Sequence, residues 1–288
     1  MKNKFETDSN SNVLFVTNQC NNHCIMCCQP PGKGDDIDRF YAHNLRLIAT
    51  APKDTKEVCI TGGEPTLAGD RLIDLVQEIR NTLPNTIIHI LSNGRNFQYN
   101  NYTHRLAEAG GDKLIFGIPL HSDYSGDHVK IAGAKGAFYE TIHGLYNLSE
   151  ENCCIELRVV INKLNYNRLP QMADFIFKNL PFVSWVALMA MEDTGLAIKN
   201  DAKIWIEPVD YAPQLCAAVD TLDQWAIPVA IYNVPLCLLP ASHRKFAAKS
   251  ISDWKTKYLE SCDSCSQKEN CCGLFATSKK EFKGIYSI

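Results

Sequence analysis

The sequence lacks a long apolar run, an apolar start and an excess of charge of one sign. No segment of its 288 residues approaches the roughly 20 continuous apolar residues that a membrane-spanning helix requires. The stretch from Met1 to Asn12 is polar and gives no secretory signal, so we expect a cytoplasmic protein. The net charge of −3, with no basic stripe interleaved with aromatics, indicates neither a nucleic-acid-binding nor a membrane-binding protein.

Cysteine, in contrast, is abundant, with 13 residues. A secreted disulfide scaffold would account for many cysteines, but such scaffolds are short. Here the count is odd, no export signal precedes it, and several cysteines are grouped at metal-ligand spacings. We therefore expect a reducing cytoplasm and thiolates that hold iron.

The length suits one large α/β domain with a small appendage. Strand and helix patterns alternate along the chain, which predicts a parallel sheet because parallel strands need crossover connections. Six such units fit an open, partial (β/α)6 barrel of the TIM type better than a closed barrel of eight units. The expected strands are 13–17, 57–61, 86–91, 113–118, 155–161 and 183–189, and the expected helices are 37–48, 71–83, one around Leu106 that stops at Gly110, 138–148 and 169–179.

The pattern changes at about residue 200. One more helix is expected over 211–225 and a short strand over 227–232, but the last forty residues are polar, rich in cysteine and weakly periodic. We expect two domains, a partial barrel over 1–200 and a small extension organised by a metal over 201–288.

Three cysteines, Cys20, Cys24 and Cys27, directly follow the first expected strand. Their spacing, C-x3-C-x2-C, differs from the ferredoxin runs, and three thiolates can hold three irons of a [4Fe–4S] cube. The fourth iron would stay open to bind another molecule. At the carboxyl end of a barrel strand, where such barrels carry their active sites, this triad predicts catalysis.

A turn of the sequence Gly62-Gly63-Glu64-Pro65 directly follows the strand expected over 57–61. Glycines let a backbone approach a ligand closely, and proline stiffens the exit from the turn. Glu64 can accept charge-assisted hydrogen bonds from an ammonium group. Alone, the turn is a weak signal, but about forty residues after the triad it is a strong one.

Together the triad and the turn resemble the signature of the radical SAM superfamily. The resemblance implies that a [4Fe–4S] cluster on the triad binds S-adenosylmethionine at its open iron and that the turn holds the methionine amino group. It also implies reductive cleavage to a 5′-deoxyadenosyl radical and an electron donor such as flavodoxin or ferredoxin. Four further residues are candidate contacts to S-adenosylmethionine: Asn93, Ser122, Lys130 and Asn162. For each of them, an ordinary loop side chain that bonds its neighbours is an equally good interpretation.

A second cysteine set, Cys262, Cys265 and Cys271, reads C-x2-C-x5-C. Either Cys237 or Cys272 can supply a fourth thiolate. The set resembles the auxiliary-cluster segment of SPASM and twitch-type radical SAM enzymes in a version with one extra [4Fe–4S] cluster. Four thiolates also suit a structural zinc site, and the sequence leaves that alternative open.

Proline-flanked segments give a narrower resemblance. Residues 17–21, 26–27, 29–31, 235–240 and 251–255 are similar to the smaller maturase of the His-Xaa-Ser peptide systems. The resemblance implies modification of a ribosomally made peptide. Because only about a dozen residues precede the first expected strand, we expect a partner protein to present the leader of that peptide.

Three other functions are alternatives to a peptide maturase. A radical SAM enzyme that acts on a small molecule or a nucleobase has the same scaffold. A non-catalytic Fe–S electron carrier would have fully ligated metals and would not cleave S-adenosylmethionine, which the open triad beside Glu64 argues against. A barrel hydrolase would need a nucleophile–base set, which the sequence does not contain in recognisable form.

Overall fold

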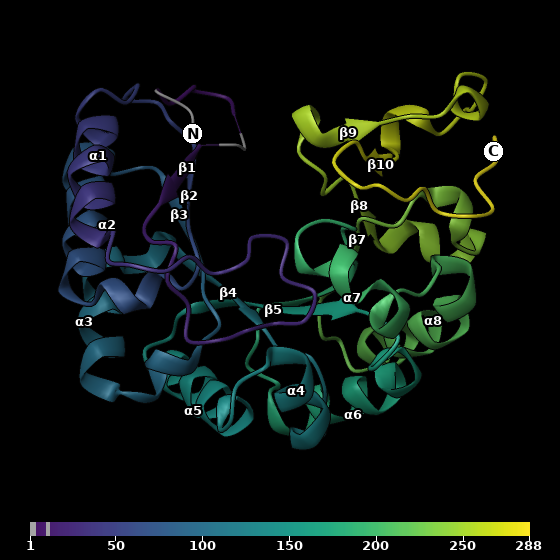
Figure 1. The fold of residues 1–288 in the computed structure, drawn as a ribbon, viewed down its shortest axis with the longest axis horizontal. Helices are drawn as coiled ribbons and strands as arrows, with labels where there is room; N and C mark the ends of the chain where they lie inside the picture. Colours follow the sequence, from purple (N-terminus) through teal and green to yellow (C-terminus); the bar gives the residue numbers. More distant parts are fainter. Residues whose placement is uncertain (1–3, 10–11) are drawn as a thin grey trace. The chain divides into compact units, whose positions relative to one another are not determined.

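The structure, a computed structural model, describes residues 4–9 and 12–288. Eight strands form one sheet in which each strand lies beside the strand that precedes it in sequence, from β1 to β8. Helices separate most consecutive strands (Figure 1). The predicted class, an open α/β partial barrel, is confirmed, and the sheet contains two strands more than the six predicted.

The chain divides into two compact units, each built from several segments. The first comprises residues up to 23, 30–119 and 134–156, and the second comprises 24–29, 120–133 and 157–288. Strand β5 (Cys154–Ile161) runs through both. The boundary predicted at residue 200 stays a prediction, because compactness does not assign a role to either unit.

The first unit holds the amino-terminal half of the sheet. Its strands pair in parallel, with Phe15 opposite Thr61 and Ile60 opposite Ile90. Parallel strands end at a common edge, so the segments that follow β1, β2 and β3 meet there. The elements are β1 (Val13–Phe15), α1 (Ile37–Ala49), β2 (Glu57–Thr61), α2 (Asp70–Thr82), β3 (Ile87–Leu91), α3 (Asn100–Gly110), β4 (Leu114–Pro119) and α5 (Ala137–Glu150).

Hydrophobic periodicity explains these elements. In α2 the buried side chains Leu72, Leu75, Val76 and Ile79 recur at helical spacing and form one apolar face. In β2 buried and half-buried side chains alternate, as in a strand with period two. Helices α1, α2 and α3 pack side by side in chain order (Figure 1).

The second unit continues the sheet with β6 and adds two strands whose pairing is also parallel. Beyond the sheet, two strands of two residues form a small antiparallel pair. The elements of the second unit are α4 (Ser125–Ala132), α6 (Leu169–Asn179), β6 (Trp185–Ala190), α7 (Leu196–Ile204), α8 (Pro208–Gln224), β7 (Val229–Tyr232), β8 (Ala247–Ala248), β9 (Thr256–Lys257) and β10 (Leu274–Phe275).

Two helices, α4 and α7, were not predicted. They have 8 and 9 residues, and α7 buries only Ala197 and Ile204. Two turns with so few buried positions do not display a helical period in the sequence. The short strand predicted over 227–232 corresponds to β7, which pairs with β6 and so belongs to the main sheet.

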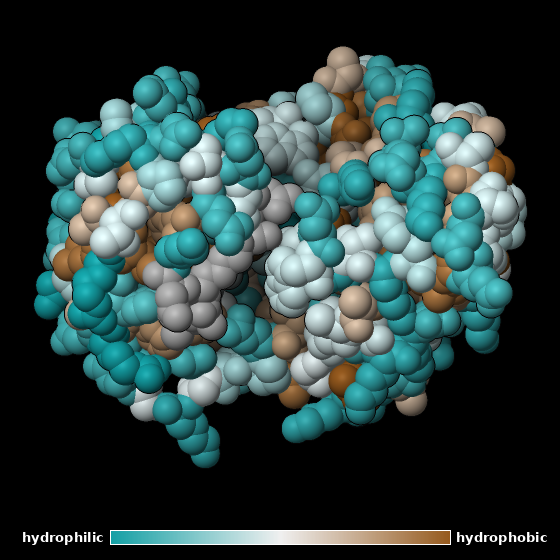
Figure 2. Space-filling view, turned by 90° about the horizontal axis from the view of Figure 1, so that it is seen from above, coloured by the Kyte–Doolittle hydropathy of each residue, from teal (hydrophilic) through white to brown (hydrophobic). Residues whose placement is uncertain are grey.

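Hydrophilic residues cover most of the face shown in Figure 2. Within residues 4–9 and 12–288, no helix has both the length and the apolar character needed to cross a membrane.

Candidate functional site

The cysteine triad lies on the loop between β1 and α1. Asp36, just before α1, closes the base of this loop because its carboxylate accepts hydrogen bonds from Thr17 Oγ1 at 2.6 Å and from Asn18 Nδ2 at 2.5 Å. The loop passes from one unit to the other, so that Cys20 belongs to the first unit and Cys24 and Cys27 to the second. Each unit thus holds its own part of the triad.

Cys20 has two potential hydrogen-bond donors near its sulfur. The backbone N–H of Asn22 donates to Sγ at 3.4 Å, and Asn93 Nδ2 lies 4.0 Å from it. Burial raises the pKa of the Cys20 thiol above its ordinary value. Donors aimed at a sulfur suit a thiolate that ligates iron, because hydrogen bonds to the sulfurs stabilise their negative charge.

In the second unit the triad loop is held by its backbone. Ile25 N–H donates to the carbonyl of Ile131 at 2.9 Å, and Leu196 N–H donates to the carbonyl of Cys27 at 2.8 Å. Between these two bonds Met26 is buried in a cluster with Ile131, Met191, Ala197 and Ile204, against which Cys24 packs. The loop around Cys24 and Cys27 therefore has a fixed path on helices α4 and α7.

The Gly62–Pro65 turn lies directly against the first part of the triad loop. Gly63 N–H donates to the carbonyl of Thr17 and Glu64 N–H to that of Gln19, both at 2.7 Å. A Cβ at Gly62 would lie 2.6 Å from Thr17 O, and one at Gly63 would lie 2.1 Å from Gln19 O. Both glycines are thus required by the contact with the triad loop, a reason that the sequence did not reveal.

Glu64 is fully buried, and its carboxylate is surrounded by donors. Oε1 accepts from the Thr66 N–H at 3.0 Å, the Thr66 hydroxyl at 2.6 Å and the Ser92 hydroxyl at 2.7 Å, and Oε2 accepts from the Asn93 N–H at 2.6 Å. Burial nevertheless raises the pKa of this carboxyl above its ordinary value. The side chain ties the turn after β2 to the end of β3, and its predicted contact with an ammonium group stays a prediction.

Three of the other candidate contacts to S-adenosylmethionine follow strands β3, β4 and β5, and their side chains already have hydrogen-bond partners within the protein. Asn93 Nδ2 donates to Asn21 Oδ1 at 2.6 Å, Ser122 Oγ accepts from the Tyr124 N–H at 3.1 Å, and Asn162 Oδ1 accepts from the Leu164 N–H at 2.9 Å. Lys130 is exposed on α4. Their role in binding S-adenosylmethionine stays a prediction.

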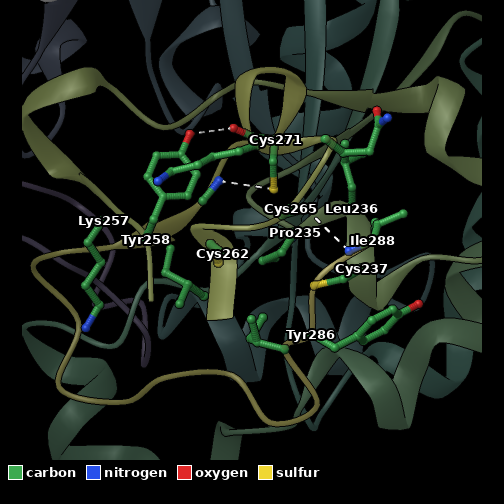
Figure 3. A pocket seen from close by; sticks show the side chains of 15 residues that line it. Pro235, Leu236, Cys237, Lys257, Tyr258, Cys262, Cys265, Cys271, Tyr286 and Ile288 are labelled. Carbon is green, nitrogen blue, oxygen red and sulfur yellow. Dashed lines mark hydrogen bonds between the residues drawn. The ribbon is translucent and has the colours of Figure 1, made fainter. Parts of the chain in front are cut away.

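The second cysteine set surrounds one pocket of the second unit (Figure 3). Cys237 lies on the short 3₁₀ helix η5 (Leu236–Leu238), Cys262 ends the 3₁₀ helix η8 (Glu260–Cys262), and Cys271 directly follows η9 (Lys268–Asn270). Cys272 does not line the pocket but is buried in an apolar cluster with Ile251 and Phe275. Of the two candidates for the fourth ligand, the arrangement favours Cys237.

Backbone N–H groups point at the sulfurs of this pocket. Gly273 donates to Cys271 Sγ and Ile288 to Cys265 Sγ, both at 3.5 Å. A hydrogen bond from the Cys272 thiol, with help from backbone N–H groups, lowers the pKa of Cys271 to about 6. A thiolate at neutral pH is the ligand form that both iron and zinc require.

Among the residues that the structure describes, no three His, Cys, Asp or Glu side chains converge as the ligands of a single metal ion. The chemistry of the donors suits a metal group in both places, with three thiols on one loop and four around one pocket. The four-thiol set can ligate a metal fully, whereas the triad leaves one position of a [4Fe–4S] cube unligated.

The sequence did not point to Arg95, Ser92 or Thr66. All three bond the triad loop or Glu64 from first-unit segments that follow β2 and β3. Their only signal in the sequence is their place after a predicted strand, where side chains of neighbouring strands meet.

Residues 14–176, more than half of the chain, match the family model described as Radical SAM superfamily. A probable GTP 3′,8-cyclase of Saccharolobus islandicus is 28% identical over 186 residues, which cover 64% of this chain and 57% of that protein. The tungsten-containing aldehyde ferredoxin oxidoreductase cofactor-modifying protein of Pyrococcus furiosus is 28% identical over 172 residues, which cover 57% of this chain and 47% of that protein. The chain thus spans about half the length of the curated relatives it matches.

Two solved structures share the fold. Streptococcus suis SuiB bound to S-adenosylmethionine aligns with a TM-score of 0.57 at 16% identity, covering 76% of this chain and 46% of that one. Native anSMEcpe with bound AdoMet and the Cp18Cys peptide aligns with a TM-score of 0.56 at 15% identity, covering 75% and 62%. The family match, over the segment that carries the triad and the Gly62–Pro65 turn, shows that the chain belongs to the radical SAM superfamily.

Proposed function

We propose that this radical SAM enzyme modifies a ribosomally made peptide and uses two iron–sulfur clusters to do so. When bound, a reduced [4Fe–4S] cluster with S-adenosylmethionine supplies a 5′-deoxyadenosyl radical that can remove hydrogen from an unactivated carbon. Cys20, Cys24 and Cys27 would hold that cluster, and the Gly62–Pro65 turn would hold the methionine end of the cofactor. The work left to the protein is to bind and orient the peptide and to exclude water.

The observation that carries the proposal is the pocket lined by Cys237, Cys262, Cys265 and Cys271. Four thiolates with no open position suit a cluster that transfers electrons. Such a cluster would accept the electron that a substrate radical must lose when a crosslink or a double bond forms. We infer iron rather than zinc because zinc has no redox chemistry to offer in that step.

The peptide substrate is proposed from the segments that resemble the His-Xaa-Ser maturase. One of them supplies Pro235, Leu236 and Cys237 to the pocket lining. Another, residues 251–255, contributes Ile251 to the cluster that buries Cys272, directly beside the proposed ligand Cys271. We also propose a partner protein that presents the leader of the peptide, and a cytoplasmic setting that keeps the thiols reduced.

A second candidate is the modification of a nucleotide or of a cofactor precursor. It is favoured by the curated relatives, which include probable GTP 3′,8-cyclases and a cofactor-modifying protein. The same four-thiol pocket would then stand beside a small-molecule substrate.

One assay separates the two candidates. The protein is reconstituted anaerobically with iron and sulfide, reduced with dithionite and given S-adenosylmethionine with either a His-Xaa-Ser peptide or GTP. We expect 5′-deoxyadenosine to form, and to form faster with the peptide, whose mass changes by the loss of hydrogen. Faster formation with GTP and an unchanged peptide mass would reverse the assignment. Absence of 5′-deoxyadenosine under all conditions, despite an assembled and reduced triad cluster, would favour an electron carrier.

A further inference from the structure

Arg95 connects the part of the loop that carries Cys20 to helix α5, within the first unit. Its Nε donates to Glu140 Oε2, and its Nη1 donates both to the carbonyl of Asn21 and, at 2.9 Å, to Asn22 Oδ1. The Arg95 side chain is only 13% exposed. A planar guanidinium with several partners and little access to water has one orientation, so it fixes the residues directly after Cys20.

Asn93 reinforces the same attachment. Its Nδ2 donates to Asn21 Oδ1 at 2.6 Å, its Oδ1 accepts from the Arg95 N–H at 3.1 Å, and its carbonyl accepts from the Thr141 hydroxyl at 3.0 Å. Asn93 and Arg95, after β3, therefore hold residues 21 and 22 directly, and the start of α5 in turn holds Asn93 and Arg95.

Glu140 has room for its role because a glycine precedes it by four residues. Gly136, with φ of +83°, adopts a left-handed conformation that glycine tolerates, and a Cβ there would lie 2.9 Å from Glu140 Oε1. Glu140 also lies in the first turn of α5, where the helix dipole stabilises a negative charge. The Arg95–Glu140 pair is thus built into the start of the helix.

The two charges of the pair relate differently to Cys20. Arg95 bonds the two residues that follow Cys20, whereas the bond from Glu140 toward this loop ends at Arg95. One-electron reduction adds negative charge to a cluster, so a nearby cation makes reduction easier and a nearby anion makes it harder.

We propose that Arg95 is a positioning residue for the triad cluster, which fixes the Cys20 loop and, balanced by Glu140, raises the reduction potential of that cluster. The inference rests on the proposed role of Cys20 as a cluster ligand. It assigns to Glu140 the opposite effect on the potential, because Glu140 offsets part of the Arg95 charge.

The test is the reduction potential of the triad cluster in three variants, followed by EPR during anaerobic reduction. The signal of this cluster is identified as the one that changes when S-adenosylmethionine is added. Arg95→Gln is expected to shift the potential to more negative values, and Glu140→Gln to more positive values. Arg95→Lys keeps the positive charge but loses the planar guanidinium with its several N–H donors. Its potential should therefore lie close to that of the wild type, while a chelator still removes its iron faster than from the wild type.

Each outcome decides a separate question. Shifts of opposite sign support the proposal, whereas shifts of the same sign, or no shift in a cluster that still responds to S-adenosylmethionine, would overturn it. A merely structural role would accelerate iron loss in every variant without opposite shifts. If the wild type assembles no cluster that responds to S-adenosylmethionine, the proposed function itself is wrong. That outcome is distinct from a failure of the Arg95 proposal, which would appear only in the variants.

Discussion

The two cysteine sites differ in what holds them. The Cys20 segment is positioned by backbone N–H groups after β2 and by the Asn93 side chain after β3, and these strands belong to a sheet of eight strands. The four thiols of the second site lie on 3₁₀ turns and loops, and the nearest sheet has two strands of two residues each. Short elements of this kind bury little apolar surface, so the second site depends more on its metal for stability.

One thiol of the second site also differs from the rest. Burial raises the pKa of Cys20 in the first site and of Cys237 in the second, whereas the neighbouring Cys272 thiol lowers the pKa of Cys271 to about 6. A raised pKa suits a ligand that becomes a thiolate only when iron arrives, and a lowered pKa suits a first ligand that is ready for metal at neutral pH. The comparison teaches that one chain can build an open site on a rigid sheet edge and a closed site from loops.

Removing each cysteine site in turn should give the largest difference between the two sites. In a Cys20→Ala, Cys24→Ala, Cys27→Ala variant, formation of 5′-deoxyadenosine should fall to background because no iron is left to bind S-adenosylmethionine. Replacing the four pocket cysteines by alanine should spare that cleavage but lower the thermal midpoint of the reconstituted protein. The product is measured by chromatography and the midpoint by circular dichroism. Residual cleavage in the triad variant would contradict the assignment.

The fourth ligand of the second site is the next test. Cys237→Ala should lose the iron of this site, because Cys237 lines the pocket with Cys262, Cys265 and Cys271. Cys272→Ala is the matched comparison, since Cys272 is buried in an apolar cluster and donates a hydrogen bond to Cys271 without lining the pocket itself. It should keep its iron and lose about 1 kcal/mol of stability, the scale of one buried methylene-sized group.

Iron per protein, measured before and after treatment with a chelator, distinguishes these two variants. If Cys272→Ala loses the iron and Cys237→Ala keeps it, the choice of ligand is reversed. Zinc in place of iron after expression in iron-rich medium would show a structural knot and remove the proposed electron-transfer role.

Much of the fold was predictable because it rests on periodicity. The strand 57–61 and the helix 169–179 were predicted with the bounds that the structure gives them, since each has a regular apolar pattern between clear turns. Helices α4 and α7 were missed because their order comes from tertiary contacts, such as the bond from Leu196 N–H to the carbonyl of Cys27.

The candidate site was predictable only where a motif marks it. The triad and the Gly62–Pro65 turn stand out in the sequence. The fourth ligand of the second set does not, because the stretch between Cys237 and Cys262 has no ligand pattern, so the sequence left Cys237 and Cys272 as alternatives. Arg95 and Ser92 escaped notice because their partners, Asn21 and Glu64, lie about 74 and 28 residues away in sequence and meet them only through the parallel register of β1, β2 and β3.

The hydrogen bonds to the buried Glu64 carboxylate test how firmly the sheet holds the first site. In Glu64→Gln the amide group replaces one of two acceptor oxygens, so at least one of the four surrounding donors loses its partner. An unsatisfied buried donor costs about 1–3 kcal/mol, which urea unfolding should detect. Glu108→Gln, at an exposed position of α3, is the control and should leave the unfolding midpoint unchanged.

The same variant has a pH signature. Because burial raises the pKa of Glu64, the folded state binds its proton more tightly than the unfolded state. Between the ordinary glutamate pKa and the raised value, the wild type therefore loses stability relative to Glu64→Gln as pH rises. Unfolding midpoints of both proteins from pH 4.5 to pH 8 measure how much more stable the wild type is than Glu64→Gln. This advantage should shrink as pH rises, and an advantage that grows with pH would contradict the raised pKa.

The smallest expected effect concerns a single backbone donor of the second site. Ile288→Pro removes the N–H that donates to Cys265 Sγ at 3.5 Å, while Ser266 can still donate to the carbonyl of residue 288. Hydrogen bonds to cluster sulfurs raise the reduction potential, so the variant should shift the second cluster to a slightly more negative potential. Ile288→Val keeps the N–H and should behave as the wild type.

The EPR signal that does not respond to S-adenosylmethionine reports the shift. Equal potentials in the two variants would mean that the sulfur of Cys265 gains nothing from this donor. The triad cluster should be unaffected in both variants, because Cys20, Cys24 and Cys27 receive their own contacts from β3, α4 and α7 rather than from residues 285–288.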